Sequence, residues 1–167
     1  MANKYCVVRT DLLAGTDVGA NLRSLRFYNA EGKHAEVENG VIAHLEALED
    51  GQREVYKAVA ATAGAKLMEC ALIAAPEVMY DERLRNLDDF INEKGKAVRG
   101  YVLHSNDQFS VTAEGFVNGS VPAVGDEVGI GANGKIDAEG TGLGKCVHIE
   151  QAGRYTYYDI LVGKTEA

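Results

Sequence analysis

Residues 80–104 are the only part of this chain whose sequence clearly predicts a helix. Apolar residues recur there at steps of three and four, which places them on one face of a helical period of about 3.6 residues. These residues are Leu84, Leu87, Phe90 and Ile91. Asp81 can cap the start of the helix, and Gly95 can end it in a left-handed conformation. Because short strands are predicted on both sides, we expect this helix to be a strut between two β-rich halves.

The rest of the chain predicts short strands separated by turn residues. The expected strands cover residues 4–9, 24–28, 42–46, 55–59, 67–74, 100–103, 108–112, 124–130, 135–138, 146–150 and 155–162. The dipeptides that suit the positive φ angles of tight turns are Asn39-Gly40, Asp50-Gly51 and Asn118-Gly119. Residues 54–68 are Ala-rich and could be helical on propensity alone. Thr62 and Gly64 interrupt them, which favours a strand followed by a loop.

The sequence therefore predicts a mainly β protein with one short helix. We expect two small β-barrel or sandwich-like units joined by the helical strut, with an extended N-terminal arm. The expected parts are 1–23 for the first strand and the arm, 24–79 for the first unit, 80–104 for the strut and 105–167 for the second unit. A chain of 167 residues could also fold around one core that both units share.

The charge of the chain argues against two classes of partner. The formal net charge is −8, and the Lys and Arg residues are spread singly along the sequence. Binding to nucleic acid or to anionic membranes needs clustered positive charge, so neither is expected. The chain has no apolar run near the length of a membrane span, and its start lacks the pattern of a signal peptide. We therefore expect a soluble protein made in the cytoplasm.

No pattern in the sequence predicts catalytic, cofactor-binding or metal-binding residues, so an enzyme is not expected. Residues 129–134 match the Gly-rich dinucleotide fingerprint, but the residues after Gly134 cannot form the required helix, and Asn133-Gly134 favours a hairpin turn. The acidic residues of the strut alternate with Arg and Lys, as on a solvated helix face. The four His residues have no ligand spacing. The Cys residues, which lie far apart beside apolar neighbours, are expected to be buried free thiols; they are Cys6, Cys70 and Cys146.

Tyrosines gather near the end of the chain. Tyr157 and Tyr158 are adjacent in an expected strand, so their rings must face opposite sides and one of them should point outward. Tyr is favoured in protein–protein contacts because it combines a large rigid area with a hydroxyl group. The alternative is that these are ordinary half-buried residues of a sheet.

Four segments of the chain carry a resemblance to a known family. They are residues 1–11 (MANKYCVVRTD), 73–83 (IAAPEVMYDER), 86–101 (NLDDFINEKGKAVRGY) and 153–158 (GRYTYY). The chain resembles small proteins encoded in the head-gene region of tailed bacteriophages of Gram-positive hosts, most closely capsid decoration (cement) proteins. The resemblance covers most of the chain, and its motifs have no catalytic content.

This resemblance implies a structural virion protein on the outer surface of the phage head. It would bind the major capsid protein, bridge neighbouring subunits and stabilise the head against the pressure of packaged DNA. A homo-oligomer is implied, with a trimer as one option, and no cofactor is implied. The expected capsid contacts lie in the arm, in residues 93–99 and in the last strand: Tyr5, Arg9, Leu12, Leu13, Leu22, Lys94, Lys96, Arg99, Tyr157 and Tyr158.

Two alternatives remain open from the sequence. A tail or connector component of the virion would share small β-barrels and arms with a decoration protein. A small β-barrel enzyme or ligand-binding protein would instead hold a polar pocket between the two halves.

Overall fold

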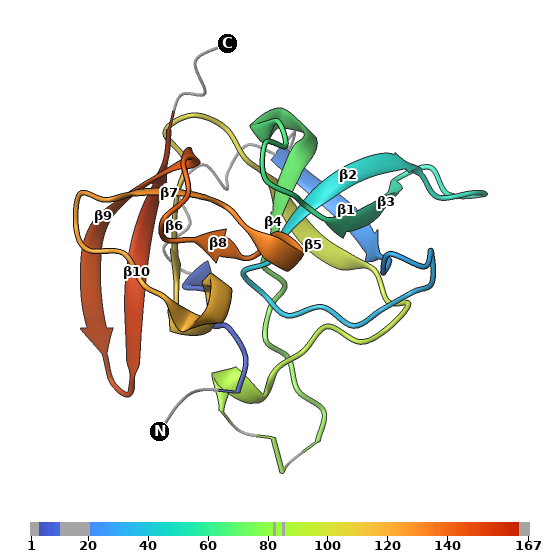
Figure 1. Cartoon of the computed structure of the whole chain (residues 1–167). Coiled ribbons are helices and arrows are strands. Elements are labelled where there is room, and N and C mark those ends of the chain that lie inside the picture. Colours follow the sequence, from blue (N-terminus) through green and yellow to red (C-terminus); the bar gives the residue numbers. More distant parts are fainter. Residues whose placement is uncertain (1–3, 11–20, 82, 85, 164–167) are drawn as a thin grey trace.

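Ten strands form a closed barrel and a second sheet that lie against one another (Figure 1). The computed structural model describes residues 4–10, 21–81, 83–84 and 86–163 of the chain. The expectation of a mainly β protein with a barrel is confirmed. In the described residues the helical segments are 3-10 turns of three residues: η3 (Leu67–Glu69), η4 (Leu87–Asp89), η5 (Ala113–Gly115), η6 (Val117–Gly119) and η7 (Ala132–Gly134).

The first five strands close into the barrel. They are β1 (Leu22–Phe27), β2 (Ile42–Leu48), β3 (Val55–Ala60), β4 (Cys70–Ile73) and β5 (Val98–Val102), in the spatial order β1-β3-β2-β4-β5. β1 pairs with β3 in parallel, and β1 with β5 antiparallel, which closes the ring. The other neighbours in the barrel are antiparallel.

The barrel interior is narrow because small residues line it. Its buried cluster contains the side chains of Ala43, Ala58 and Ala71, with Leu25 among them. Gly100 of β5 faces the same interior, where a Cβ atom would collide with the side chain of Leu25. A barrel of so few strands holds only a few side chains, and Leu25 occupies the space beside Gly100 while Ile73 and Val98 belong to the same cluster.

The last five strands form the second, antiparallel sheet. They are β6 (Gln108–Val111), β7 (Glu127–Ile130), β8 (Ile136–Asp137), β9 (Gly142–Ala152) and β10 (Tyr155–Val162), in the order β6-β10-β9-β7-β8. The turn between β7 and β8 has positive φ at Asn133 and at Gly134. Residues 129–134 therefore belong to a hairpin, as predicted, and not to a dinucleotide-binding turn.

The barrel and the second sheet share one apolar core. Its members come from the outer faces of β2 and β4 and from the inner face of the second sheet, and include Ile42, Leu72, Phe109, Leu143 and Ile160. All four residues of β4 are buried, because one face of this strand lines the barrel and the other packs against the sheet. The continuous apolar run of β4 is the pattern expected of a strand that is covered on both faces.

The N-terminal segment, residues 4–10, extends the second sheet. Val8 forms an antiparallel bridge with Val111 of β6, and the amide of Arg9 donates to the carbonyl of Ser110 at 3.1 Å. The predicted first strand is thus present as a short pairing on the edge of β6. Most of the expected arm, residues 11–20, lies outside the described residues. β1 of the barrel begins at Leu22, one residue before the expected end of the arm at residue 23.

The helical strut predicted over residues 80–104 is wrong. The residues described there contain only the single turn η4, and Val98–Val102 is a barrel strand. Leu84 and Leu87, which the periodicity assigns to a buried stripe, are exposed. Gly95 does adopt positive φ, but it does so within a loop. The two β units are joined by direct contact through their shared core and not by a strut.

Candidate functional site

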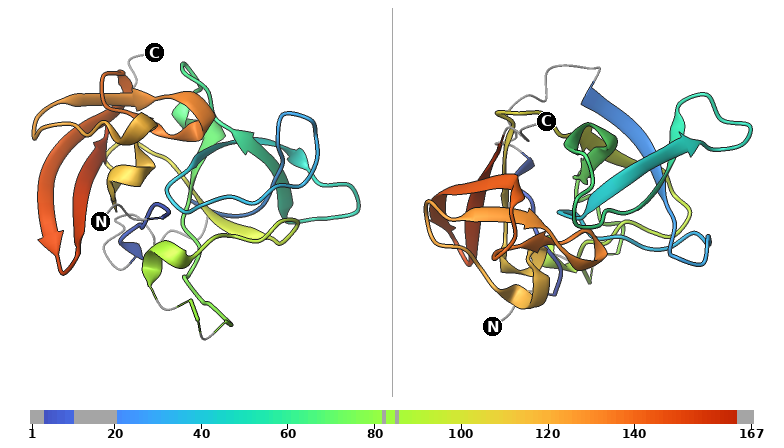
Figure 2. Two further views of the ribbon diagram at one scale, coloured as in Figure 1. Left: turned by 60° about the horizontal axis from the view of Figure 1, so that its bottom comes forward. Right: turned by 45° about the horizontal axis from the view of Figure 1, so that its top comes forward.

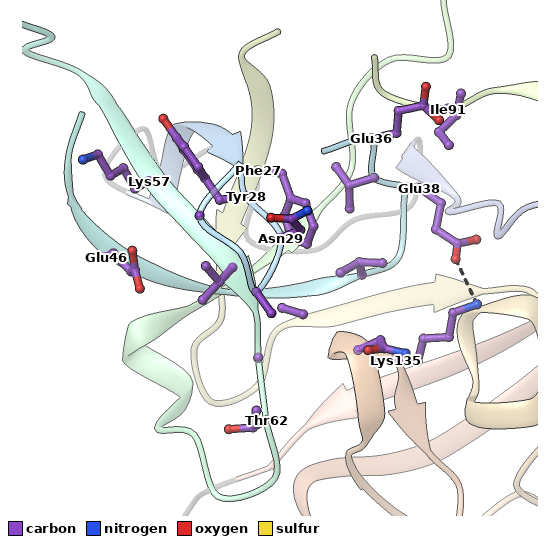
Figure 3. A pocket seen from close by; sticks show the side chains of 18 of the residues that line it. Phe27, Tyr28, Asn29, Glu36, Glu38, Glu46, Lys57, Thr62, Ile91 and Lys135 are labelled. Carbon is purple, nitrogen blue, oxygen red and sulfur yellow. Dashed lines mark ion pairs between the residues drawn. The ribbon is translucent and has the colours of Figure 1, made fainter. Parts of the chain in front are cut away.

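An open groove of about 990 Å³ lies where several parts of the chain meet (Figure 3). Its walls come from the barrel and the loop after β1, together with Tyr5 of the N-terminal segment, Ile91, and Lys135 after the β7–β8 turn. The Nζ atom of Lys135 lies 2.9 Å from a carboxylate oxygen of Glu38, and this ion pair joins the barrel side to the second sheet. Another oxygen of Glu38 accepts the amide of Cys6 at 2.9 Å.

A long loop between β4 and β5 is the second surface feature. The described residues of the segment 76–97 are here called the apolar loop, and the middle of this loop projects beyond the barrel and the sheet (Figures 1 and 2). Loops of this length are uncommon in compact domains and often carry function.

Large apolar side chains are exposed on the apolar loop. Nine such side chains are exposed in the described part of the chain, and four of them lie within residues 78–87. These are Val78 (58% exposed), Tyr80 (88%), Leu84 (39%) and Leu87 (40%). The loop also borders a hollow of about 570 Å³, lined by Val78, Tyr80 and Leu84 on one side and by Val98 of β5 on the other. Exposed apolar side chains gathered in this way are characteristic of surfaces that contact another protein.

Two ion pairs lie within the apolar loop. Arg83 contacts the carboxylate of Asp81 through two nitrogen atoms, with the shortest distance 2.6 Å, and these hydrogen bonds lower the pKa of Asp81. Lys96 lies 2.8 Å from Glu93, whose hydrogen bond raises the pKa of Lys96. The charges of these four residues are therefore balanced locally.

Two buried asparagines hold the ends of the apolar loop. The side chain of Asn39 accepts a hydrogen bond from the amide of Ala75 at 3.0 Å and donates one to its carbonyl at 2.8 Å. The side chain of Asn92 donates to the carbonyl of Val37 at 2.9 Å and to Asn39 at 3.0 Å. The backbones of Asn92 and Val37 also exchange two hydrogen bonds. The loop therefore leaves and rejoins the barrel at fixed points.

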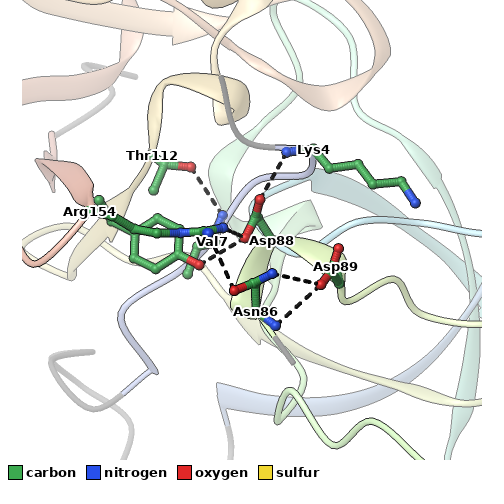
Figure 4. A network of polar contacts seen from close by, with 8 residues as sticks. Lys4, Val7, Asn86, Asp88, Asp89, Thr112 and Arg154 are labelled. Carbon is green, nitrogen blue, oxygen red and sulfur yellow. Dashed lines mark hydrogen bonds and ion pairs between the residues drawn. The ribbon is translucent and has the colours of Figure 1, made fainter. Parts of the chain in front are cut away.

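Asp88 holds the middle of the apolar loop (Figure 4). It is 7% exposed, and its carboxylate accepts hydrogen bonds from the amide of Lys4 at 3.3 Å and from the hydroxyl of Tyr155 at 2.9 Å. Arg154 forms an ion pair with the same carboxylate. The side chain of Asn86 and that of Asp89 form a capping box around η4. Asp88 thus joins the loop to the N-terminal segment and to the β9–β10 hairpin.

A cluster of ionisable groups lies on the barrel at the end of β1. The hydroxyl of Tyr28 donates to Glu49 at 2.7 Å, which lowers the pKa of Glu49 and raises that of Tyr28. Because the single phenolic proton is used there, Nε2 of His34 donates to the Tyr28 oxygen, 2.8 Å away. Arg26 pairs with the other oxygen of Glu49. Every member has a partner within the cluster, which is the arrangement of a structural network.

The thiols are buried and unpaired, as predicted. Cys6, Cys70 and Cys146 are all free and buried. Burial raises the pKa of Cys6 to about 12 and that of Cys70 to about 11, so these thiols are poor nucleophiles. Among the described residues no group of three or more His, Cys, Asp or Glu side chains has the geometry to hold a metal ion. The same residues contain no helix long and apolar enough to cross a membrane.

The structure separates the residues that the sequence analysis selected as contacts. Lys94 and Arg99 are exposed near the end of the apolar loop, and Lys96 is paired with Glu93. Tyr5 lines the groove, and Leu22 lies in β1. Leu12 and Leu13 lie outside the described residues.

The tyrosines of β10 do not present a free ring. Tyr158 packs against the shared core, with its ring edge-on to Phe116 at 5.5 Å between centroids. Tyr157 points to the opposite face but is only 3% exposed, and the guanidinium of Arg9 lies 5.3 Å above its ring. Arg9 also pairs with Glu150 at 3.2 Å. These residues hold the N-terminal segment on the second sheet.

The exposed apolar residues of the loop were missed by the sequence analysis. Leu84 and Leu87 were assigned to a buried helical face, and Val78 and Tyr80 were not selected. A signal was present, because Asn86, Asp88, Asp89 and Asn92 are poor residues for a helix interior and prefer local hydrogen bonds to the backbone.

Comparison of the chain with protein-family models, with curated proteins and with solved structures finds no match.

Proposed function

We propose that this chain is a structural virion protein that binds the outer surface of a bacteriophage capsid through the apolar loop. In this role it bridges neighbouring subunits of the major capsid protein and stabilises the head against internal DNA pressure. The observation that carries the proposal is the gathering of exposed apolar side chains on a loop that is held at both ends and in its middle.

The anchored loop suits this role because its attachment points are fixed before the partner arrives. The hydrogen bonds of Asn39, Asn92 and Asp88 already fix the two ends of the loop and its residue Asp88 in the free protein. Association then has a smaller entropy cost, which favours affinity. Repetition of one modest interface at many symmetry-related positions makes each bridge between subunits harder to break.

The family resemblance supports the same surface. The segments that carry it, residues 1–11, 73–83, 86–101 and 153–158, include both ends of the apolar loop and its partners at Asp88. Two of these segments therefore overlap the apolar loop, and the other two lie outside it. Assembly as a homo-oligomer, with a trimer as one option, belongs to this proposal.

The test is a binding assay on purified phage heads that lack this protein. Recombinant chain is added, and sedimentation separates bound from free protein. We expect saturable binding at a fixed ratio to the major capsid protein. We also expect the heads to resist heat better once the protein is bound. Absence of binding to heads, together with self-assembly into rings or tubes, would contradict the proposal and indicate a tail or connector component.

A further inference from the structure

The groove has an unbalanced set of charges. Its lining includes three carboxylates and two ammonium groups. Both ammonium groups are already paired: Lys135 lies 2.9 Å from Glu38, and Lys57 lies 3.7 Å from Asp50 outside the groove. Glu36 and Glu46 are exposed and have no ion-pair partner among the described residues. The groove therefore carries a net negative charge.

The two unpaired carboxylates lie on opposite sides of an apolar floor. Figure 3 shows Glu46 on the barrel side and Glu36 near Ile91. Apolar side chains of the barrel and of the loop after β1 line the space between them: Phe27, Val37, Val41, Val59, Ala60 and Ala61. A ligand with separated positive charges and an apolar body would complement this lining.

We propose that this groove binds a short extended peptide segment, from another protein, that alternates basic and aliphatic residues. Side chains of an extended chain point alternately to opposite faces, so its aliphatic residues can face the floor while its basic residues reach toward Glu36 and Glu46. The site lies at the junction of the barrel, the second sheet and the N-terminal segment, a common position for ligand sites. This proposal does not depend on capsid binding, because the groove shares only Ile91 with the hollow beside the apolar loop.

Three peptide probes test the chemistry of the groove. Each fluorescent peptide has about six residues and spans roughly 20 Å when extended. One peptide alternates Lys with Leu, the second alternates Glu with Leu, and the third alternates Lys with Ser. Fluorescence anisotropy at low salt should detect saturable binding of the Lys-Leu peptide alone. The proposal would be overturned if the Lys-Ser peptide bound equally well, or if the polyamine spermidine competed equally well with the Lys-Leu peptide. Either result would show that the groove binds by charge alone. Failure of all three peptides to bind would overturn it as well.

Paired variants locate the binding site. The double variant Glu36→Gln, Glu46→Gln should lower the affinity for the Lys-Leu peptide about fivefold, as expected for the loss of two exposed ion pairs. The control Glu54→Gln, Glu139→Gln removes the same charge from exposed residues outside the groove and should leave affinity unchanged. Val59→Ser should weaken binding by reducing the apolar floor. Equal effects of the two double variants would overturn the assignment, since net charge alone would then explain binding.

Discussion

At the scale of single residues, Asp88 connects three parts of the molecule that are far apart in sequence. One carboxylate accepts bonds from the N-terminal segment and from the β9–β10 hairpin, while its backbone belongs to the apolar loop. A buried carboxylate is tolerated only when donors surround it, and removing it leaves the amide of Lys4 and the hydroxyl of Tyr155 without this acceptor.

Asp88→Ala should therefore lower the free energy of unfolding by about 2–3 kcal/mol. Asp89→Ala is the matched control, because the bonds of Asp89 stay within η4, and it should cost about 0.5 kcal/mol. Urea denaturation followed by circular dichroism measures both values. Equal losses in the two variants would show that Asp88 does not have the connecting role described.

The buried thiols should resist alkylation in the folded protein. The thiolate is the reactive form, and a raised pKa lowers its fraction at every pH below that pKa. With a pKa of about 12, Cys6 has about one thiolate in ten thousand molecules near pH 8. Mass spectrometry after iodoacetamide treatment should find all three thiols unmodified, and modified once urea is added. Rapid alkylation of the native protein would contradict the burial of these residues.

At the scale of elements, the barrel depends on complementary sizes across its interior. Leu25 of β1 occupies the space that Gly100 of β5 leaves open. In so narrow an interior, changing either residue affects the room available to the other.

Leu25→Ala and Gly100→Ala should therefore be coupled in a double-mutant cycle. Alone, Leu25→Ala creates a cavity and should lower the free energy of unfolding by about 3 kcal/mol. Gly100→Ala alone overpacks the barrel and should lower it by about 2 kcal/mol. Together they should cost about 1 kcal/mol less than the sum, because the shortened side chain makes room for the new methyl group. Leu143→Ala with Gly100→Ala is the control pair and should be additive, since Leu143 lies in the other core cluster. Additivity in both pairs would contradict the packing described.

Strands and turns could be predicted because their signals are local. Residues 155–162 were predicted to be a strand and form β10, and Asn133-Gly134 forms the predicted hairpin turn. The expected strand after residue 54 is β3, so the Ala-rich run is not a helix.

The helix and the site could not be predicted because distant contacts determine them. Residues 84–91 have helical periodicity, yet Asp88 bonds to Arg154 and Asn92 pairs with Val37, which hold the backbone in a loop. These contacts supply hydrogen bonds that a helix would otherwise make, and nothing in the local pattern reveals them. The exposure of Leu84 and Leu87 follows from the same contacts. The apolar loop therefore could not be predicted from the sequence.

At the scale of the whole molecule, the shared core makes the two β units depend on each other. The outer faces of β2 and β4 are covered by the second sheet, and the N-terminal segment bonds to both: Cys6 to Glu38 and Val7 to Thr112. Neither unit can lose its structure without exposing apolar surface of the other.

We expect the chain to unfold in one cooperative transition. Urea curves from circular dichroism and from tyrosine fluorescence should have the same midpoint. Leu25→Ala in the barrel and Leu143→Ala in the second sheet should each shift both curves equally. Two separate midpoints, or a shift confined to one curve, would show that the units are independent.

The central claim is that the apolar loop binds the capsid, and head binding by loop variants tests it most directly. The triple variant Val78→Ser, Tyr80→Ser, Leu87→Ser removes apolar surface from the loop without touching its anchors. The control Leu48→Ser, Met68→Ser, Val124→Ser removes exposed apolar side chains elsewhere. In the sedimentation assay we expect the loop variant to lose saturable binding to heads and the control to bind like the original chain. Full binding by the loop variant would contradict the claim.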